Sequence, residues 1–179
     1  MALKATIYKV ELQVSDIDRG HYGTHGLTLA RHPSETEQRL MLRLLAFAMH
    51  AEETLEFGRG LSTEDEPDLW LKGPTGEIEL WIDLGLPDER RLRRASGRAR
   101  RVVLLAYGER SFEVWWRKQA QALARLDNLT VWSIPDATVA ALSTLADRGM
   151  QLQVTIQDGQ VTVGDGDQFL ELDLERLQG

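Results

Sequence analysis

The chain has 179 residues, 42% hydrophobic and 27% charged, a composition typical of a folded globular protein. It contains no cysteine, which excludes a disulfide scaffold, thiolate zinc sites, iron–sulfur clusters and a cysteine nucleophile. With 28 acidic and 21 basic side chains the formal net charge is -7, which argues against a protein that coats nucleic acid non-specifically. An anionic partner would therefore have to meet a local basic patch.

The first residues alternate polar and apolar side chains and lack the continuous apolar run of a secretory signal. No apolar stretch reaches the roughly 18 residues that a membrane-spanning helix needs. A cytoplasmic protein without membrane contact is therefore expected. The length and the lack of a long linker favour a single domain over residues 1–179.

The first half of the chain predicts a hairpin, a long helix and two more strands. Alternation of polar and apolar residues predicts the hairpin over 4–14 and 21–30. Apolar residues at helical spacing then predict the longest helix over residues 34–56. Two strands joined by a glycine-containing turn are predicted at 67–72 and 77–84.

In the second half, helices are predicted at 88–98, 111–124 and 136–146, and strands at 101–107 and 128–134. This alternation implies a sheet with parallel strands and helices packed on it. A period of two returns at the end, where strands are predicted at 151–157, 160–163 and 168–174. The pattern indicates an α/β (α+β) protein.

Two aspartates carry the first functional hypothesis. Side chains alternate along a strand, so Glu79, Trp81 and Asp83 share one face of the second strand. If this strand pairs with the preceding one, Asp68 approaches Asp83. Two carboxylates at the end of a sheet are ligands that Mg²⁺ prefers. The alternative is that they are ordinary solvent-facing acids on an exposed strand face.

Seven arginines fall between Arg90 and Arg101, one third of the basic residues. On a helix, Arg91, Arg94 and Arg98 form a stripe that is offset from the apolar stripe. Guanidinium groups bind phosphate bidentately, so this segment predicts contact with nucleic acid. The alternative is a solvated face that pairs with the acidic stretch 62–66 and with Asp88 and Glu89.

The other polar residues favour structural roles. Glu37 lies near the start of the longest predicted helix, where a carboxylate is favoured by the helix dipole, and a capping role is expected. The four histidines lack the spacing of a metalloprotease, and neither a phosphate-binding P-loop nor a nucleophile elbow is present. The five tryptophans can stack on bases, but packing in the core is the more usual role.

The segments 31–37, 66–70, 80–89 and 111–116 together resemble the YaeQ family of bacterial proteins, and the resemblance covers the whole chain. It implies a variant of the restriction-endonuclease-like, or PD-(D/E)XK, fold. That fold is a mixed β-sheet flanked by helices, here with an added N-terminal β-hairpin and extra C-terminal strands.

In that nuclease superfamily a Pro-Asp opens one core strand, the next strand carries an acid followed two residues later by lysine, and the first core helix often supplies a glutamate. The resemblance implies these roles for Asp68, Asp83 and Glu37, with Mg²⁺ as the cofactor. The lysine position holds Gly85. Three other residues are candidates to supply the missing cation: Arg91, Arg94 and Lys72.

Three functions follow as hypotheses. The first is a magnesium-dependent, nuclease-like protein in which Arg91 and Arg94 contact the phosphodiester of a nucleic acid. The second is a catalytically degenerate form of the fold that binds nucleic acid or a protein partner in gene expression, with Arg98 part of the binding surface. The third is a structural network of acids and arginines without a ligand.

Overall fold

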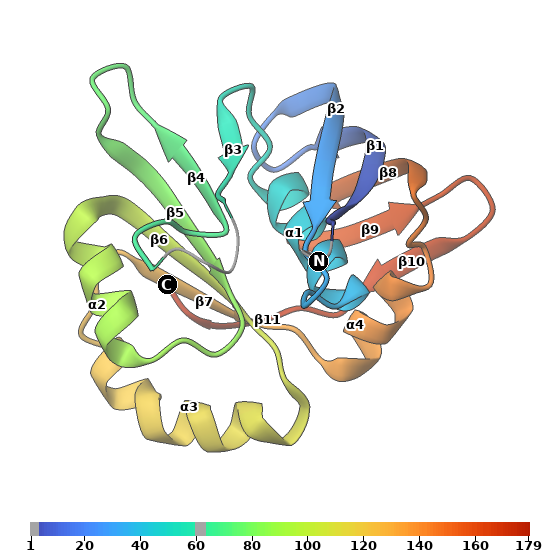
Figure 1. Cartoon of the computed structure of the whole chain (residues 1–179). Helices are drawn as coiled ribbons and strands as arrows, with labels where there is room; N and C mark the ends of the chain where they lie inside the picture. The colour runs from blue at the N-terminus through green and yellow to red at the C-terminus, as the bar shows by residue number, and fades with distance from the viewer. Residues whose placement is uncertain (1–3, 60–63) are drawn as a thin grey trace. The chain divides into compact units, whose positions relative to one another are not determined.

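The computed structural model describes residues 4–59 and 64–179, which fold as two compact units (Figure 1). One unit comprises Met1–Glu52 and Ala137–Asp173, and the other comprises Glu53–Asp136 and Leu174–Gly179. Each unit contains its own mixed β-sheet, so the fold is a mixed α+β arrangement with two sheets. The sequence pattern predicted one mixed sheet, because strand pairing between distant segments leaves no local signal.

The first unit holds a five-stranded sheet in the order β10-β9-β8-β1-β2. Its strands are β1 (Thr6–Asp16), β2 (His21–Arg31), β8 (Gly149–Gln157), β9 (Gln160–Gly164) and β10 (Phe169–Leu172). The predicted N-terminal hairpin and C-terminal strands are confirmed. Strand β1 pairs with β8 in parallel, so the hairpin and the C-terminal strands form one sheet. Two helices belong with this sheet: α1 (Glu37–Met49) and α4 (Asp136–Ser143).

Helix α1 is shorter than predicted. The Thr36 hydroxyl accepts the Arg39 N–H at 3.1 Å, so Thr36 and not Glu37 is the N-cap. Glu37 lies in the first turn, which confirms the predicted position near the helix start where the dipole favours a carboxylate. The helix ends at Met49, and Leu55 lies in strand β3 (Leu55–Phe57), opposite Leu71. Leu55 fits the apolar spacing of the predicted helix, but it is buried by pairing in the sheet and not by packing on a helix face.

The second unit holds a six-stranded sheet in the order β11-β7-β6-β5-β4-β3. Its further strands are β4 (Leu69–Lys72), β5 (Ile78–Leu84), β6 (Ala99–Ala106), β7 (Leu129–Ser133) and β11 (Glu175–Gln178). Strands β5, β6 and β7 run parallel, as the alternation predicted, and the other pairs are antiparallel. The sequence did not predict β11, a short edge strand in which polar residues predominate.

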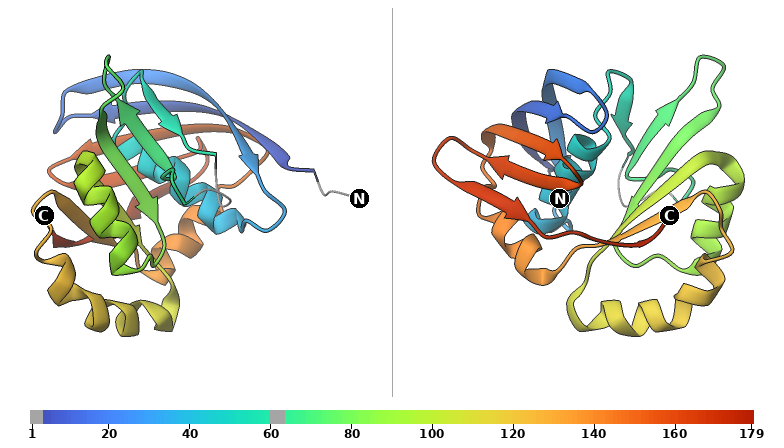
Figure 2. Two further views of the ribbon diagram at one scale, coloured as in Figure 1. Left: turned by 60° about the vertical axis from the view of Figure 1, so that its left-hand side comes forward. Right: turned by 180° about the vertical axis from the view of Figure 1, so that it is seen from behind.

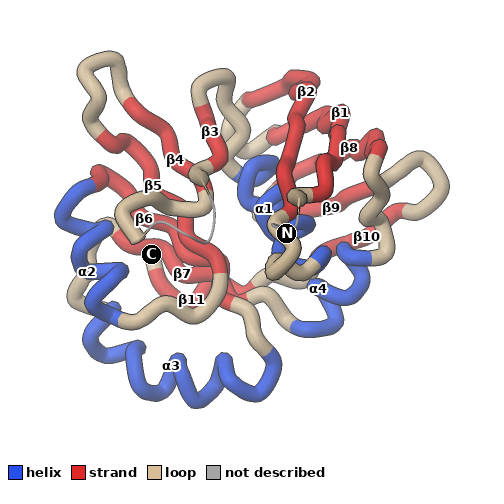
Figure 3. The backbone as a smooth tube through the Cα atoms, viewed as in Figure 1, coloured by secondary structure: helices blue, strands red, loops and turns tan. Residues whose placement is uncertain are grey.

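Helices α2 (Glu89–Arg98) and α3 (Glu109–Leu123) pack on this sheet, alongside β5, β6 and β7 in Figures 2 and 3. Trp81 of β5 and Trp115 of α3 belong to the shared core, which confirms the packing role predicted for these two tryptophans. The Trp115 indole N–H donates to the Pro87 carbonyl at 2.7 Å. None of the described helices combines the length and apolar character needed to cross a membrane.

Candidate functional site

Asp68 and Asp83 lie opposite one another at the junction of β4 and β5. Leu69 pairs with Ile82, and the Asp68 N–H donates to the Ile82 carbonyl at 3.0 Å, so the register extends to the two aspartates. The Leu84 N–H donates to one carboxylate oxygen of Asp68 at 2.8 Å. The approach of the two acids, predicted from strand parity, is confirmed.

The face of β5 that carries Asp83 is buried, and the expectation of an exposed strand face is wrong here. Trp81 is 2% exposed and Asp83 is 1% exposed. The amphipathic helix α2 packs its Leu92 and Ala95 into the core that contains Trp81. Because the helix covers this face, the charge of Asp83 requires a partner within the protein.

Arg91 is that partner. Its Nε and Nη2 atoms donate to the two oxygens of Asp83 at 2.8 and 3.0 Å, a bidentate pair. Its Nη1 and Nη2 atoms also donate to the carbonyls of Glu64 and Glu66, at 2.9 and 3.0 Å. The hydrogen bonds that Arg91 donates to Asp83 raise the pKa of the Arg91 guanidinium above its usual value. Arg91 is therefore held as a permanent cation beside the two aspartates.

In this arrangement the acids do not fit a magnesium site. Both oxygens of Asp83 accept from Arg91, and one oxygen of Asp68 accepts from Leu84. Mg²⁺ would need oxygen ligands at the place that the guanidinium occupies. Across residues 4–59 and 64–179, no group of three or more histidine, aspartate or glutamate side chains is placed to hold a metal ion.

Glu37 belongs to the first unit, and its described partner lies there as well. The Tyr8 hydroxyl of β1 donates to the Glu37 carboxylate at 3.2 Å. Burial raises the pKa of the Tyr8 phenol, and the bond to Glu37 raises it further. This contact ties the start of α1 to the sheet.

Gly85 stands where the nuclease motif has lysine, and Lys72 is one of the residues proposed to replace that lysine. Gly85 has a φ of +102° and donates its N–H to the Leu105 carbonyl at 3.0 Å as the chain leaves β5. This backbone conformation favours glycine over lysine. The Lys72 ammonium lies 3.7 Å from the centroid of the Trp70 ring, a cation–π contact next to a bulge in β4.

The arginine stripe of α2 lines a cavity of about 310 Å³, which we call the arginine pocket. Its lining includes Arg90, Arg91, Arg94, Arg98 and Trp81. The predicted placement of the three stripe arginines on one face is confirmed. The Arg98 guanidinium carbon lies 5.1 Å from the centroid of the Trp81 ring, and that of Arg91 lies 5.7 Å from it.

The acidic stretch contacts part of this pocket, as the alternative interpretation predicted. Arg94 lies 3.3 Å from a carboxylate oxygen of Asp65, and Arg98 donates to the Asp65 carbonyl at 3.0 Å. Residues 62 and 63 of the predicted stretch lie outside the described residues. The Arg90 side chain, in contrast, makes no ion pair or hydrogen bond with the part of the chain that the structure describes.

Trp81 adds a feature that the sequence interpretation missed. Its indole Nε1 is buried and has no hydrogen-bond partner among the described residues. A buried donor without a partner costs about 1–3 kcal/mol. Strand parity had placed Trp81 on the face of Asp83, but only the packing of α2 brings the guanidinium groups of Arg91 and Arg98 near this ring.

A family model described as YaeQ protein matches residues 1–174. Two similar curated proteins, from Salmonella typhi and Escherichia coli (strain K12), are both named "Uncharacterized protein YaeQ". They are 51% and 48% identical over 178 residues, which is 99% of this chain and 98% of each relative.

Two crystal structures have the same fold. The YaeQ protein from Xanthomonas axonopodis pv. citri aligns with a TM-score of 0.94 and 50% identity, over 98% of this chain and 99% of that one. The YaeQ protein from Pseudomonas syringae aligns with a TM-score of 0.93 and 42% identity, over 98% of this chain and 97% of that one.

Proposed function

Since the chain belongs to the YaeQ family, we propose from its own geometry that it binds phosphate groups of nucleic acid through the arginine pocket, without a metal ion. The observation that carries this proposal is the convergence of four arginines on one cavity beside a buried tryptophan. It is the second of the three functions predicted from the sequence.

The arginines divide into a fixed group and an available group. Arg91 is committed to Asp83 and to two backbone carbonyls. Arg90 has no described partner, and Arg94 has only a surface pair with Asp65, whose side chain is 80% exposed. A surface pair of this kind contributes about 0–1 kcal/mol, so a phosphate can replace it at little cost. The available guanidinium groups provide the fork geometry that phosphate accepts.

The charge balance restricts the ligand. The protein carries a net charge of -7, so phosphates far from the pocket meet a repulsive surface. A short or structured nucleic acid that presents a few phosphates to α2 fits this distribution better than a long duplex wrapped along the protein.

A metal-dependent nuclease is the second candidate, and one observation favours it. The opposed pair Asp68 and Asp83, with a Pro-Asp at the start of β4, has the arrangement expected of the PD-(D/E)XK superfamily, and we propose that relationship as the origin of the fold. Catalysis would require Arg91 to release Asp83. The geometry therefore favours a binding module in which an arginine has taken the place of the metal.

The proposal is tested by fluorescence anisotropy with short labelled RNA and DNA, single- and double-stranded, over a range of salt concentrations. We expect binding that weakens with salt and is unchanged by EDTA. The variant R94A/R98A should weaken binding and lower the salt slope by about 0.7–0.9 for each lost phosphate contact.

The matched control is R93A. Arg93 lies on the same helix but pairs with Glu89 and does not line the pocket. Equal losses in both variants would mean a non-specific charge effect. Absence of binding to every probe would refute the proposal, and binding or cleavage that EDTA abolishes would establish the metal-dependent function instead.

A further inference from the structure

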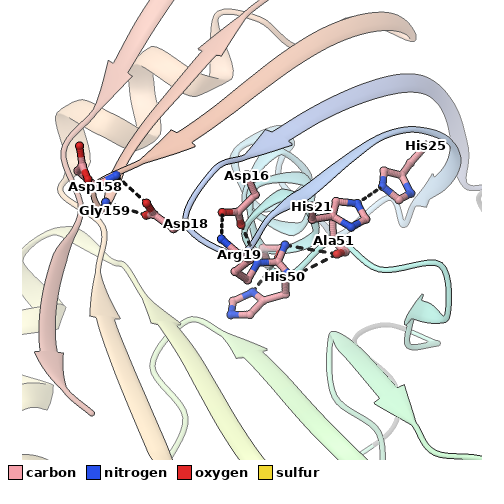
Figure 4. A network of polar contacts seen from close by, with 10 residues as sticks. Asp16, Asp18, Arg19, His21, His25, His50, Ala51, Asp158 and Gly159 are labelled. Atoms are coloured by element: carbon pink, nitrogen blue, oxygen red, sulfur yellow. Dashed lines mark hydrogen bonds and ion pairs between the residues drawn. The ribbon is translucent and has the colours of Figure 1, made fainter.

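Two histidines of β2 converge on one point in the first unit (Figure 4). The Nε2 atoms of His21 and His25 lie 3.0 Å apart and face one another, and the planes of the two rings differ by 18°. Gly23 lies between them along the strand. A Cβ atom there would be 3.6 Å from both Nε2 atoms, so any larger side chain would crowd the space that separates the rings.

The surroundings hold the two rings in this arrangement. The edge-on ring of Phe47 in α1 packs against His25 at a centroid distance of 5.2 Å. In the strand pairing, His25 lies opposite Leu12 and His21 opposite Asp16. Both histidines are half-buried, which leaves one side of the pair within reach of solvent.

An ion pair between Asp16 and Arg19 lies near the histidine pair, as Figure 4 shows. Asp16 is buried, and its two carboxylate oxygens accept from the backbone N–H and the Nε of Arg19. The guanidinium of Arg19 is held there and also donates to the Ala51 carbonyl at 3.3 Å. This ion pair neutralises the arginine next to the histidine pair.

We infer that His21 and His25 bind a divalent ion of the late first-row transition metals, such as Zn²⁺, through their Nε2 atoms. Metal–nitrogen bonds to histidine are about 2.0–2.1 Å long, so two bonds at right angles separate the nitrogens by about 2.9 Å and a tetrahedral pair by about 3.3 Å. The observed 3.0 Å lies within this range. Imidazole nitrogens suit these ions, whereas Mg²⁺ prefers oxygen ligands.

Binding moves one proton within the histidine pair and frees both Nε2 lone pairs for the metal ion. At 3.0 Å one Nε2 donates to the other, so the pair shares one proton between two lone pairs. The metal takes the place of that proton, which moves through water to the Nδ1 atom of the ring that had donated it, so both rings bind as neutral ligands protonated at Nδ1. Two protein ligands leave the remaining coordination positions to water, so the site is open. It is independent of the function proposed for the arginine pocket.

The test is a calorimetric titration of the tag-free protein with Zn²⁺, compared with H21Q and H25Q. We expect one ion per chain, and a loss of affinity of more than about tenfold in either variant. H32Q is the control, because His32 contacts Ser34 in the loop after β2. It should bind as the wild type does.

Nuclear magnetic resonance of the histidine side chains provides the second measurement. With Zn²⁺, the Nε2 resonances of His21 and His25 should shift together, and those of His32 should not. Unchanged affinity in H21Q and H25Q, equal loss in H32Q, or no binding at millimolar Zn²⁺ would each overturn the inference. Circular dichroism of each metal-free variant separates loss of the site from loss of the fold.

Discussion

Arg91 binds both carboxylate oxygens of Asp83 and places a guanidinium beside the pair that Asp83 forms with Asp68. The Asp83 side chain is 2% exposed and that of Arg91 is 29% exposed, so the aspartate depends on the arginine more than the reverse. Removing one partner of a buried pair leaves an uncompensated charge.

The first prediction concerns the stability of this pair. R91A should lower the free energy of unfolding by roughly 3 kcal/mol, because it leaves Asp83 charged and buried. R93A removes an exposed pair with Glu89 and should cost no more than about 0.5 kcal/mol. Urea unfolding of the two variants checks the contrast. Similar costs for both would show that Asp83 does not need its partner.

The second prediction concerns magnesium. Because Arg91 engages Asp83, millimolar Mg²⁺ should leave the melting temperature of the wild type unchanged, as expected when an ion binds neither state preferentially. Differential scanning calorimetry with and without EDTA measures this. A rise that disappears in D83N would show that the acids bind the ion despite the arginine.

The third prediction concerns the position of the missing lysine. G85K should destabilise the protein by about 1–2 kcal/mol, because a side chain with a Cβ is strained at a φ of +102°. It should not create metal-dependent cleavage. The control is G97K, since Gly97 lies in α2 with open space around it and without a positive φ.

Lysine is favoured over glycine in a helix, so G97K should be neutral or slightly stabilising. Thermal unfolding of both variants, with a nuclease assay on G85K, provides the measurements. Equal stability of G85K and the wild type would contradict the backbone explanation for Gly85.

The fourth prediction concerns the pH dependence that Tyr8 contributes. Burial is the main cause that raises the pKa of Tyr8 above its ordinary value of 10.0, and the hydrogen bond to Glu37 is the second. The folded protein therefore holds this proton more tightly than the unfolded chain. The stability that results is fully present below about pH 10 and is lost as the pH rises through the folded-state pKa.

Denaturant unfolding at alkaline pH, with Y8F as the reference without this phenol, measures the contribution. The stability of the wild type should fall relative to Y8F as the pH rises above 10. Replacing the partner in E37Q should lower the pKa of Tyr8, which ultraviolet absorbance of tyrosinate detects. E11Q on the exposed face of β1 is the control, and the same shift in both variants would exclude a specific role for Glu37.

The sequence by itself determined the elements whose signal is local. Alternating residues fixed the N-terminal hairpin, and the strand–helix alternation fixed the parallel strands β5, β6 and β7. Strand parity and helical spacing also placed Asp68 opposite Asp83 and aligned the arginines on one face of α2. The arginine stripe follows from the period of a single helix, whereas the approach of the aspartates also required the pairing of β4 with β5.

Tertiary structure decided what depends on distant partners. The pairing of β1 with β8 joins the two ends of the chain in one sheet and separates that sheet from the other. Leu55 lies in a strand and not in a helix because β3 pairs with β4. The packing of α2 buried Asp83 and brought its carboxylate against the Arg91 guanidinium. Side-chain spacing along the chain cannot reveal which charge neutralises a buried acid, because that choice is made by groups that meet only in the folded protein.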